Sequence, residues 1–182
     1  MINQKGIRKS KITRTCLLFL VVILAVSCES FPRPKSASDT LLIIPVAFKF
    51  ESGAQWTYRY RLDFEGLSQP IYVSPTTMHY IAVSGLPAGS YTWKKVTAVP
   101  LATGYVEMGR SDHSYDAPAV KIEIREGTAT MAPFLLEATM NQVGMRSFQQ
   151  SWGIRQVLNT DKKTISDELQ GEPAFREWKN GL

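Results

Sequence analysis

The residue types best suited to chemistry gather in one short stretch, residues 109–118 (GRSDHSYDAP). Asp112, His113 and Asp116 are two carboxylates and an imidazole, which together could supply three ligands to a metal ion. Ser, His and Asp are also the residues of a hydrolytic triad, but a triad needs side chains that converge from separate elements. Ser, Asp and Gly favour turns. We therefore interpret this stretch as a solvated loop before a strand, and we keep a hydrolase or metal site here as the less favoured alternative.

The rest of the sequence offers few groups for catalysis. The chain has two histidines, His79 and His113, and two cysteines, Cys16 and Cys28. His79 lies in TMHYIAVSG, an alternating stretch that predicts a strand with a half-exposed histidine rather than a base. The sequence contains no phosphate-binding loop, dinucleotide fingerprint or HExxH motif. We predict a protein that is not an enzyme and that has no cofactor and no metal site.

Aromatic residues form the best candidate binding surface. Trp56, Tyr58 and Tyr60 alternate along one face of AQWTYRYRLDFEG, and an exposed row of such rings could stack on sugars. Leu62 and Phe64 continue the same face, whereas the opposite face carries charged side chains and one threonine. Because aromatic side chains bury large areas in protein cores, we favour a buried row over a glycan-binding surface.

Alternating stretches of this kind recur along the middle of the chain. They are separated by Gly and Pro turns and read TLLIIPVAFKF, AQWTYRYRLDFEG, QPIYVSP, TMHYIAVSG, SYTWKKVTAVP, TGYVEMG, PAVKIEIREG and TATMAPFLLEATM. About eight short strands over roughly 100 residues favour one antiparallel β-sandwich at 41–140, and hence an all-β protein. In SYTWKKVTAVP, simple alternation puts Lys95 on the face of Trp93, which indicates aromatics near a sheet edge.

The remaining residues, 141–182, predict a C-terminal extension. NQVGMRSFQQSWGIRQVLNT is ambiguous and is compatible with one more strand. DKKTISDELQ and EPAFREWKNG predict two short helices, with Asp161 as a cap of the first and Pro173 in the first turn of the second. Phe175 and Trp178 are three residues apart and share a face, so we expect the helices to pack on the sandwich.

The N-terminal residues have the composition of a secretory signal peptide. Residues 1–14 contain five Lys or Arg and no acid, and residues 15–27 (TCLLFLVVILAVS) are almost wholly apolar. A basic segment followed by a short apolar segment is typical of a signal peptide. A helix that crosses a bilayer needs about 20 apolar residues, so a permanent transmembrane helix is the weaker interpretation.

The end of this segment, LAVSC at residues 24–28, resembles the lipobox of bacterial lipoproteins. In that family a small or branched residue and then Gly, Ala or Ser precede the cysteine. Val26, Ser27 and Cys28 match the pattern, whereas Ala25 stands where Leu is usual. The resemblance implies cleavage just before Cys28 and acylation of that cysteine. Two or more acyl chains hold a protein stably on a membrane.

Removal of residues 1–27 changes the charge of the chain. That segment carries five of the 21 Lys and Arg and no acid, and the 16 bases that remain balance the 16 Asp and Glu. A neutral domain lacks the basic surface of a nucleic-acid binder, so we expect no nucleic-acid partner. With Cys16 removed and Cys28 acylated, the folded part has no thiol for a disulfide or a metal. Residues 28–40 are polar after the cysteine and predict a flexible tether.

A second resemblance concerns the strands. Two stretches are similar to hairpins of the transthyretin-like (prealbumin-like) β-sandwich found in bacterial lipoproteins and carboxypeptidase accessory domains: GLPAGSYTW and KIEIREGTATMAPFLLEA. The ending PAFREW is similar to the helical tail of some such lipoproteins. The resemblance implies a single immunoglobulin/transthyretin-like sandwich at 41–140 that serves as a binding or structural module, with no catalytic residues to transfer.

These observations predict a lipid-anchored cell-envelope lipoprotein whose domain lies outside the cytoplasm. Its partner would be the membrane, through acylated Cys28, with a protein or a glycan as a further partner. Glu29 is not the Asp that signals inner-membrane retention in enteric bacteria, which mildly favours the outer membrane. A surface glycan-binding or adhesin-type lipoprotein is the alternative, and a hydrolase or metal site around Asp112, His113 and Asp116 is less favoured.

Overall fold

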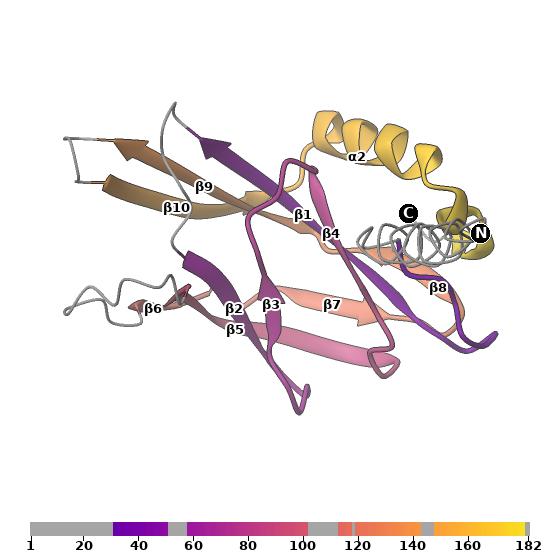
Figure 1. The fold of residues 1–182 in the computed structure, drawn as a ribbon. Coiled ribbons are helices and arrows are strands. Elements are labelled where there is room, and N and C mark those ends of the chain that lie inside the picture. The colour runs from indigo at the N-terminus through magenta and orange to yellow at the C-terminus, as the bar shows by residue number, and fades with distance from the viewer. Residues whose placement is uncertain (1–30, 51–57, 102–112, 118, 143–147, 181–182) are drawn as a thin grey trace, which may run out of the picture. The chain divides into compact units, whose positions relative to one another are not determined.

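Figure 1 presents a computed structural model of the chain, which describes residues 31–50, 58–101, 113–117, 119–142 and 148–180. Strands account for most of these residues and form two sheets. One α-helix and one 3₁₀-helix follow near the C-terminal end of the described chain. The described part is therefore all-β with a short helical tail, as the series of alternating stretches predicts.

The first sheet is built on the long strand β1 (Leu41–Phe50). The start of β1 pairs antiparallel with β4 (Tyr80–Ser84) along one edge and parallel with β8 (Thr128–Met131) along the other. The end of β1 pairs parallel with β9 (Phe134–Gln142). Strand β10 (Phe148–Gln156) continues the sheet, antiparallel to β9.

The parallel pairs correct the expectation of a purely antiparallel sandwich. A parallel pair cannot be closed by a tight turn, because the chain must first return to the starting end of the sheet. Here β1 and its parallel partners β8 and β9 are separated by the whole second sheet in sequence. The long connection that parallel pairing requires therefore includes all strands of the second sheet, together with β4.

The second sheet is built on strand β5 (Gly89–Pro100), which has partners on both sides. Strand β2 (Tyr58–Glu65) lies antiparallel to β5, with β3 (Ile71–Val73) beyond it. On the other side, the start of β5 pairs with β7 (Lys121–Ile124) and its end with β6 (His113–Asp116). β5 is thus a central strand.

The two stretches that resemble transthyretin-like hairpins connect the sheets instead. GLPAG leads from β4 in the first sheet to β5 in the second, and REG leads from β7 in the second sheet to β8 in the first. Gly85 and Gly127 adopt φ values of 75° and 67° in these two connections. Such values favour glycine, so the residues that predict turns mark the corners between the sheets.

The two sheets enclose one hydrophobic core. Ile122 and Ile124 of β7 are buried while their neighbours on the strand are exposed, because successive side chains point to opposite faces. Trp93 is fully buried at the sheet interface. Its ring centroid lies 4.2 Å from that of Phe134 in the first sheet and 6.2 Å from that of Phe64 in the second. Trp93 therefore joins the two layers.

A β-bulge in β5 overturns the expectation for Trp93 and Lys95. Asp63 pairs with Lys95 and Phe64 pairs with Trp93, so Lys94 is an extra residue on β5. The Trp93 Nε1–H donates to the Lys95 carbonyl oxygen at 3.0 Å. Because the bulge shifts the alternation, the buried residue after Trp93 on this strand is three positions later. The prediction that these aromatics lie near an edge is wrong.

The stretch TATMAPFLLEATM forms two strands rather than one. Ala132 and Pro133 interrupt it between β8 and β9. The Ala132 N–H still donates to the Ile43 carbonyl at 2.8 Å, whereas Pro133 has no N–H to donate. The register with β1 consequently changes across the interruption.

Strand β1 is buried on both faces. Leu42 and Ile44 belong to the core between the sheets, so Leu41 and Ile43 point to the opposite side, and both are 0% exposed. Figure 1 shows helix α2 (Asn159–Gly171) lying across that outer side of the first sheet. The C-terminal tail therefore covers an apolar face that the second sheet does not reach.

The covering side chains come from α2 and from the 3₁₀-helix η1 (Pro173–Glu177). Ile165 and Leu169 are the buried residues of α2, and Phe175 and Trp178 are buried in and directly after η1. The second expected helix is thus a 3₁₀-helix of five residues that begins at its proline.

The first sheet also extends beyond residue 140, where the sequence analysis ended the sandwich. Strand β10 pairs with β9 along all nine of its residues. A short strand, β11 (Lys179–Asn180), lies parallel to β8. The segment expected to be a separate extension contributes two strands to the first sheet as well as the helices.

Trp93→Ala should lower the free energy of unfolding by about 3–5 kcal/mol, because truncation leaves a cavity between the two sheets. Chemical denaturation followed by circular dichroism measures this change. Tyr72→Ala is the control: Tyr72 is 44% exposed on β3, and Arg59 Cζ lies 4.2 Å from its ring centroid, so a loss of about 1 kcal/mol or less is expected. Equal losses in the two variants would contradict the central position of Trp93.

Candidate functional site

The polar stretch at residues 109–118 falls only partly within the described chain. Asp112 lies outside the described residues, while His113 and Asp116 belong to β6. The expectation of a loop is therefore wrong for 113–116, which pair with β5 at the edge of the second sheet. Within the described residues, no group of three His, Cys, Asp or Glu side chains is arranged to hold a metal ion.

The aromatic row belongs to the core where the structure describes it. Tyr60 is 0% exposed and its ring stacks on Phe48, with 5.9 Å between the centroids. Tyr58 is half-buried and packs against the core, and Trp56 lies outside the described residues. A buried ring has no face available to a sugar, so the interpretation of Tyr60 as a core residue is correct.

His79 connects the sheet to the C-terminal helix. Its Nδ1 contacts Glu168 Oε1 of α2, and its backbone N–H donates to Glu168 Oε2 at 3.2 Å. The His79 side chain is 54% exposed. These two contacts with Glu168 join His79 to α2. His79 therefore has a structural role here, which the sequence did not indicate.

The next residue, Tyr80, lies beneath the same helix. It is buried at the start of β4, and this burial raises the pKa of its hydroxyl to about 12. The nearby carboxylates of Glu172 and Glu168 act in the same direction, because a phenolate would be repelled by both. Tyr80 therefore stays a neutral, buried support for α2.

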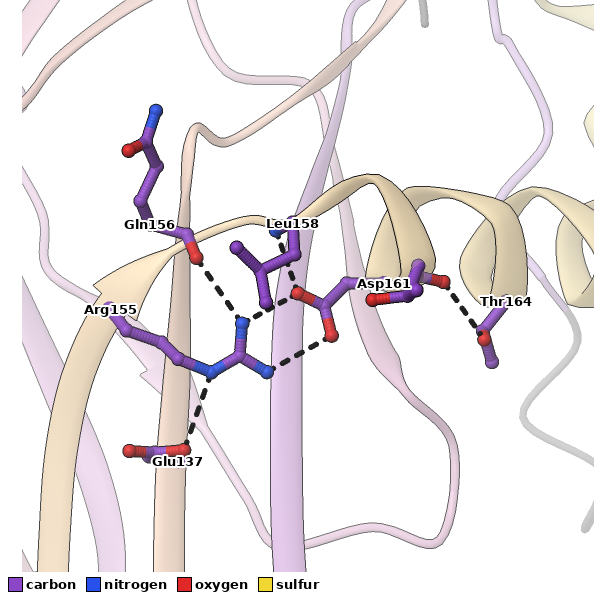
Figure 2. A network of polar contacts seen from close by, with 7 residues as sticks. Glu137, Arg155, Gln156, Leu158, Asp161 and Thr164 are labelled. Atoms are coloured by element: carbon purple, nitrogen blue, oxygen red, sulfur yellow. Dashed lines mark hydrogen bonds and ion pairs between the residues drawn. The ribbon is translucent and has the colours of Figure 1, made fainter.

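A second polar contact holds the start of α2 against β9 and β10. Figure 2 shows the Arg155 guanidinium between Asp161 on one side and Glu137 on the other. Its Nη1 and Nη2 donate to the Asp161 carboxylate at 2.6 and 3.0 Å, and its Nε lies 3.5 Å from Glu137 Oε2. Two parallel hydrogen bonds from Arg to a carboxylate fix both groups in orientation.

Asp161 also caps the start of α2, but from inside the first turn rather than from the residue before the helix. It is the third residue of α2, and its carboxylate accepts the Leu158 N–H at 2.8 Å (Figure 2). This hydrogen bond satisfies a backbone donor that the helix itself cannot pair. The hydrogen bonds from Arg155 lower the pKa of Asp161 below its ordinary value, and the Leu158 N–H adds to that effect.

The first part of the described chain is fastened to the same C-terminal tail. The Trp178 Nε1–H donates to the Pro32 carbonyl oxygen at 2.9 Å. Arg33 Nη1 lies 3.6 Å from Glu177 Oε1, although both side chains are largely exposed. These residues fall in the range expected to be a flexible tether, and from Pro32 onward the chain is held on the domain.

Asp39 shapes this fastened segment into a loop. Its carboxylate accepts the N–H groups of Lys35 and Thr40 at 3.0 and 2.9 Å, and the first of these is the main cause of its lowered pKa. The Asp39 carbonyl accepts the Gly127 N–H at 2.8 Å. A Cβ at Gly127 would lie 2.5 Å from the Ala37 carbonyl oxygen, so only glycine permits this approach.

We call the surface formed by residues 32–39, Gly127 and residues 173–180 the anchor-side end, because it includes the first residues of the folded unit after Cys28, where the sequence analysis expects an anchor. It contains a cleft of about 310 Å³, lined by the loop 34–37, Gly127 and the residues 177–179. Sequence reasoning missed this surface because its parts are about 140 residues apart, as the Trp178–Pro32 separation of 146 positions illustrates. The one available signal was the pair of aromatics, Phe175 and Trp178, in a polar tail.

Comparison of the chain with protein-family models, with curated proteins and with solved structures finds no match. None of the helices in the described residues combines the length and the apolar character needed to cross a lipid bilayer.

Asp161→Asn should destabilise the protein by about 1–2 kcal/mol near pH 7, because it weakens the bidentate pair with Arg155 and the hydrogen bond to Leu158. The folded state lowers the pKa of Asp161, so the unfolded state takes up the proton first as the pH falls. The carboxylate therefore stabilises the fold above about pH 4 and loses this effect as the pH falls through the folded pKa.

Denaturation of wild type and Asp161→Asn at pH 7 and at pH 3 tests this account. The difference between the two proteins should narrow at the lower pH. Asp167→Asn is the matched control on the same helix. Asp167 is 63% exposed, and its carboxylate forms only a loose ion pair with Lys163 Nζ at 3.8 Å, so a loss of about 0.5 kcal/mol or less is expected. An equal difference at both pH values would contradict the account.

Trp178→Phe should release the loop at residues 32–39 while it keeps an aromatic ring in place. Loss of the indole hydrogen bond, worth about 1 kcal/mol, should raise the open fraction of this loop about fivefold. Tryptic cleavage after Lys35, followed by mass spectrometry, measures the change. Trp152→Phe on β10 is the control and should cleave at the wild-type rate. Wild-type cleavage in Trp178→Phe would show that this hydrogen bond does not hold the loop.

Proposed function

We propose that the protein is a lipid-anchored lipoprotein of the bacterial cell envelope that acts as a non-catalytic structural or binding module. The observation that carries the proposal is the position of Cys28. It directly follows an apolar segment with a basic N-terminal flank, and it precedes Pro32, the first residue of the folded unit, by four positions. An acylated cysteine at this place would attach the domain to a membrane by its first residue.

The fold proposed for the module is an immunoglobulin/transthyretin-like sandwich. Two packed sheets and a shared core centred on Trp93 support this assignment. The parallel strands of the first sheet and the α2 layer on its outer face are additions to such a sandwich. They close the side of the module that would otherwise expose β1.

The alternatives receive less support from the described residues. An adhesin or glycan-binding surface built on the aromatic row loses Tyr60, because that ring is in the core. A hydrolase around Asp112, His113 and Asp116 would need further groups that converge on β6, where the only described side-chain hydrogen bond joins Thr97 to Ser114. Placement of the domain outside the cytoplasm is part of the proposal and rests on the signal-peptide-like residues 1–27, and the mild preference for the outer membrane rests on Glu29.

The experiment is metabolic labelling with a radioactive fatty acid in a bacterial host. The wild-type chain should be labelled, should lose residues 1–27 and should stay with the membrane fraction. Cys28→Ala should be unlabelled, because the thiol that takes the lipid is absent. Cys16→Ala removes the other cysteine of the chain and should be labelled like wild type. Label that persists in Cys28→Ala, or that is absent from wild type, would refute the anchoring site.

A further inference from the structure

We propose that the anchor-side end of the domain rests directly on the lipid headgroups of the membrane that holds Cys28. This inference depends on the proposed acylation of Cys28 and adds an interaction surface to it. The partner is the headgroup layer of the same leaflet that takes the acyl chains. The argument uses chain length, the contacts that fasten the first residues, and the side chains found at this end.

The length of chain between the lipid and the folded unit is short. Cys28 and Pro32 are separated by four residue steps, which span at most about 14 Å when fully extended. A tether that ran free to residue 40 would span three times that distance when extended, or about 43 Å. Where the chain becomes fixed therefore decides whether the domain lies on the membrane or stands clear of it.

The contacts at Pro32 and after it decide this question. The carbonyl of Pro32 accepts the hydrogen bond from the Trp178 indole, and Trp178 is 5% exposed. Asp39 holds the loop that follows, and the Gly127 N–H binds the Asp39 carbonyl from the β7–β8 connection. The length of chain that can separate the lipid from the fastened segment is then at most the four residue steps from Cys28 to Pro32.

The side chains of the anchor-side end suit a headgroup layer. Exposed basic residues on two separate segments of this surface can reach lipid phosphates: Arg33, Lys35, Arg176 and Lys179. Lys35 and Lys179 both line the cleft of about 310 Å³. Acidic groups are also present, at Asp39 and Glu177, so the surface is mixed in charge and suits zwitterionic phospholipid headgroups.

The opposite end of the domain supplies the comparison. Strand β8 starts at Thr128, beside the anchor-side end. Strand β1 runs alongside from Leu41, which pairs with Ala129, to Lys49, which pairs with Thr139, and these eight residue steps span about 26 Å. Exposed Ser151 on β10 pairs with Thr139. Figure 1 also places β6 at the end of the second sheet away from η1, and Ser114 on β6 is exposed.

A thiol-reactive fluorescent probe can test the proposal in the full chain. Four single variants each add one cysteine, two at the anchor-side end (Ala37→Cys and Lys179→Cys) and two at the far end (Ser151→Cys and Ser114→Cys). Acylation blocks the thiol of Cys28 and cleavage removes Cys16, so the mature acylated protein takes up one probe per chain, whereas an unacylated protein takes up two, or three if it keeps residues 1–27. Counting probes by mass spectrometry therefore tests the proposed function separately from this inference.

The acylated variants are placed in phosphatidylcholine vesicles that contain a lipid with a nitroxide on its headgroup. Nitroxide quenches only probes close to it, so probes at positions 37 and 179 should be quenched at least about twofold more than those at 151 and 114, given their separation along the strands. Equal quenching at the two ends, or stronger quenching at the far end, in a protein that carries one probe would overturn the inference and leave the lipid anchor intact.

Discussion

The structure depends on the burial of β1 on both faces. Six consecutive residues, 41–46, are buried, and an apolar strand of this kind needs a layer on each side. The second sheet covers the side of Leu42 and Ile44, and α2 with η1 covers the side of Leu41 and Ile43. Each apolar side chain removed from water adds about 1.5–3 kcal/mol to the free energy of unfolding, so loss of either covering layer would strongly destabilise the fold.

This burial on both faces explains why the C-terminal tail returns to the first residues of the folded unit. The tail must lie on β1, and β1 directly follows the fastened loop at 32–39. Trp178 can therefore reach Pro32 across 146 positions of sequence, and the polar pairs of Arg155 with Asp161 and His79 with Glu168 fix the helix between them. If Cys28 carries lipid, the same packing also determines which end of the domain the membrane approaches.

Much of the fold can be predicted from the alternation of apolar and polar residues along each strand. The alternation of Tyr60, Leu62 and Phe64 predicts their burial, because a strand with one polar face can pack only by the other. The bulge at Lys94 was not predictable in this way, since one extra residue reverses the alternation after Trp93 and leaves no compositional mark. The parallel partners of β1 were missed for a related reason, because pairing between distant strands is set by how the sheets stack.

The sequence by itself determined the neutral charge of the chain after residue 27 and the face that most strands bury, because charge follows from composition and alternation depends on residues that are close together along the chain. The boundary at Cys28 is a prediction from the same local pattern. Tertiary structure alone decided that the polar residues from Pro32 to Asp39 are fastened rather than free. Their partners, Gly127 and Trp178, are distant in sequence, and hydrogen bonds between such groups form only when packing on β1 brings them together.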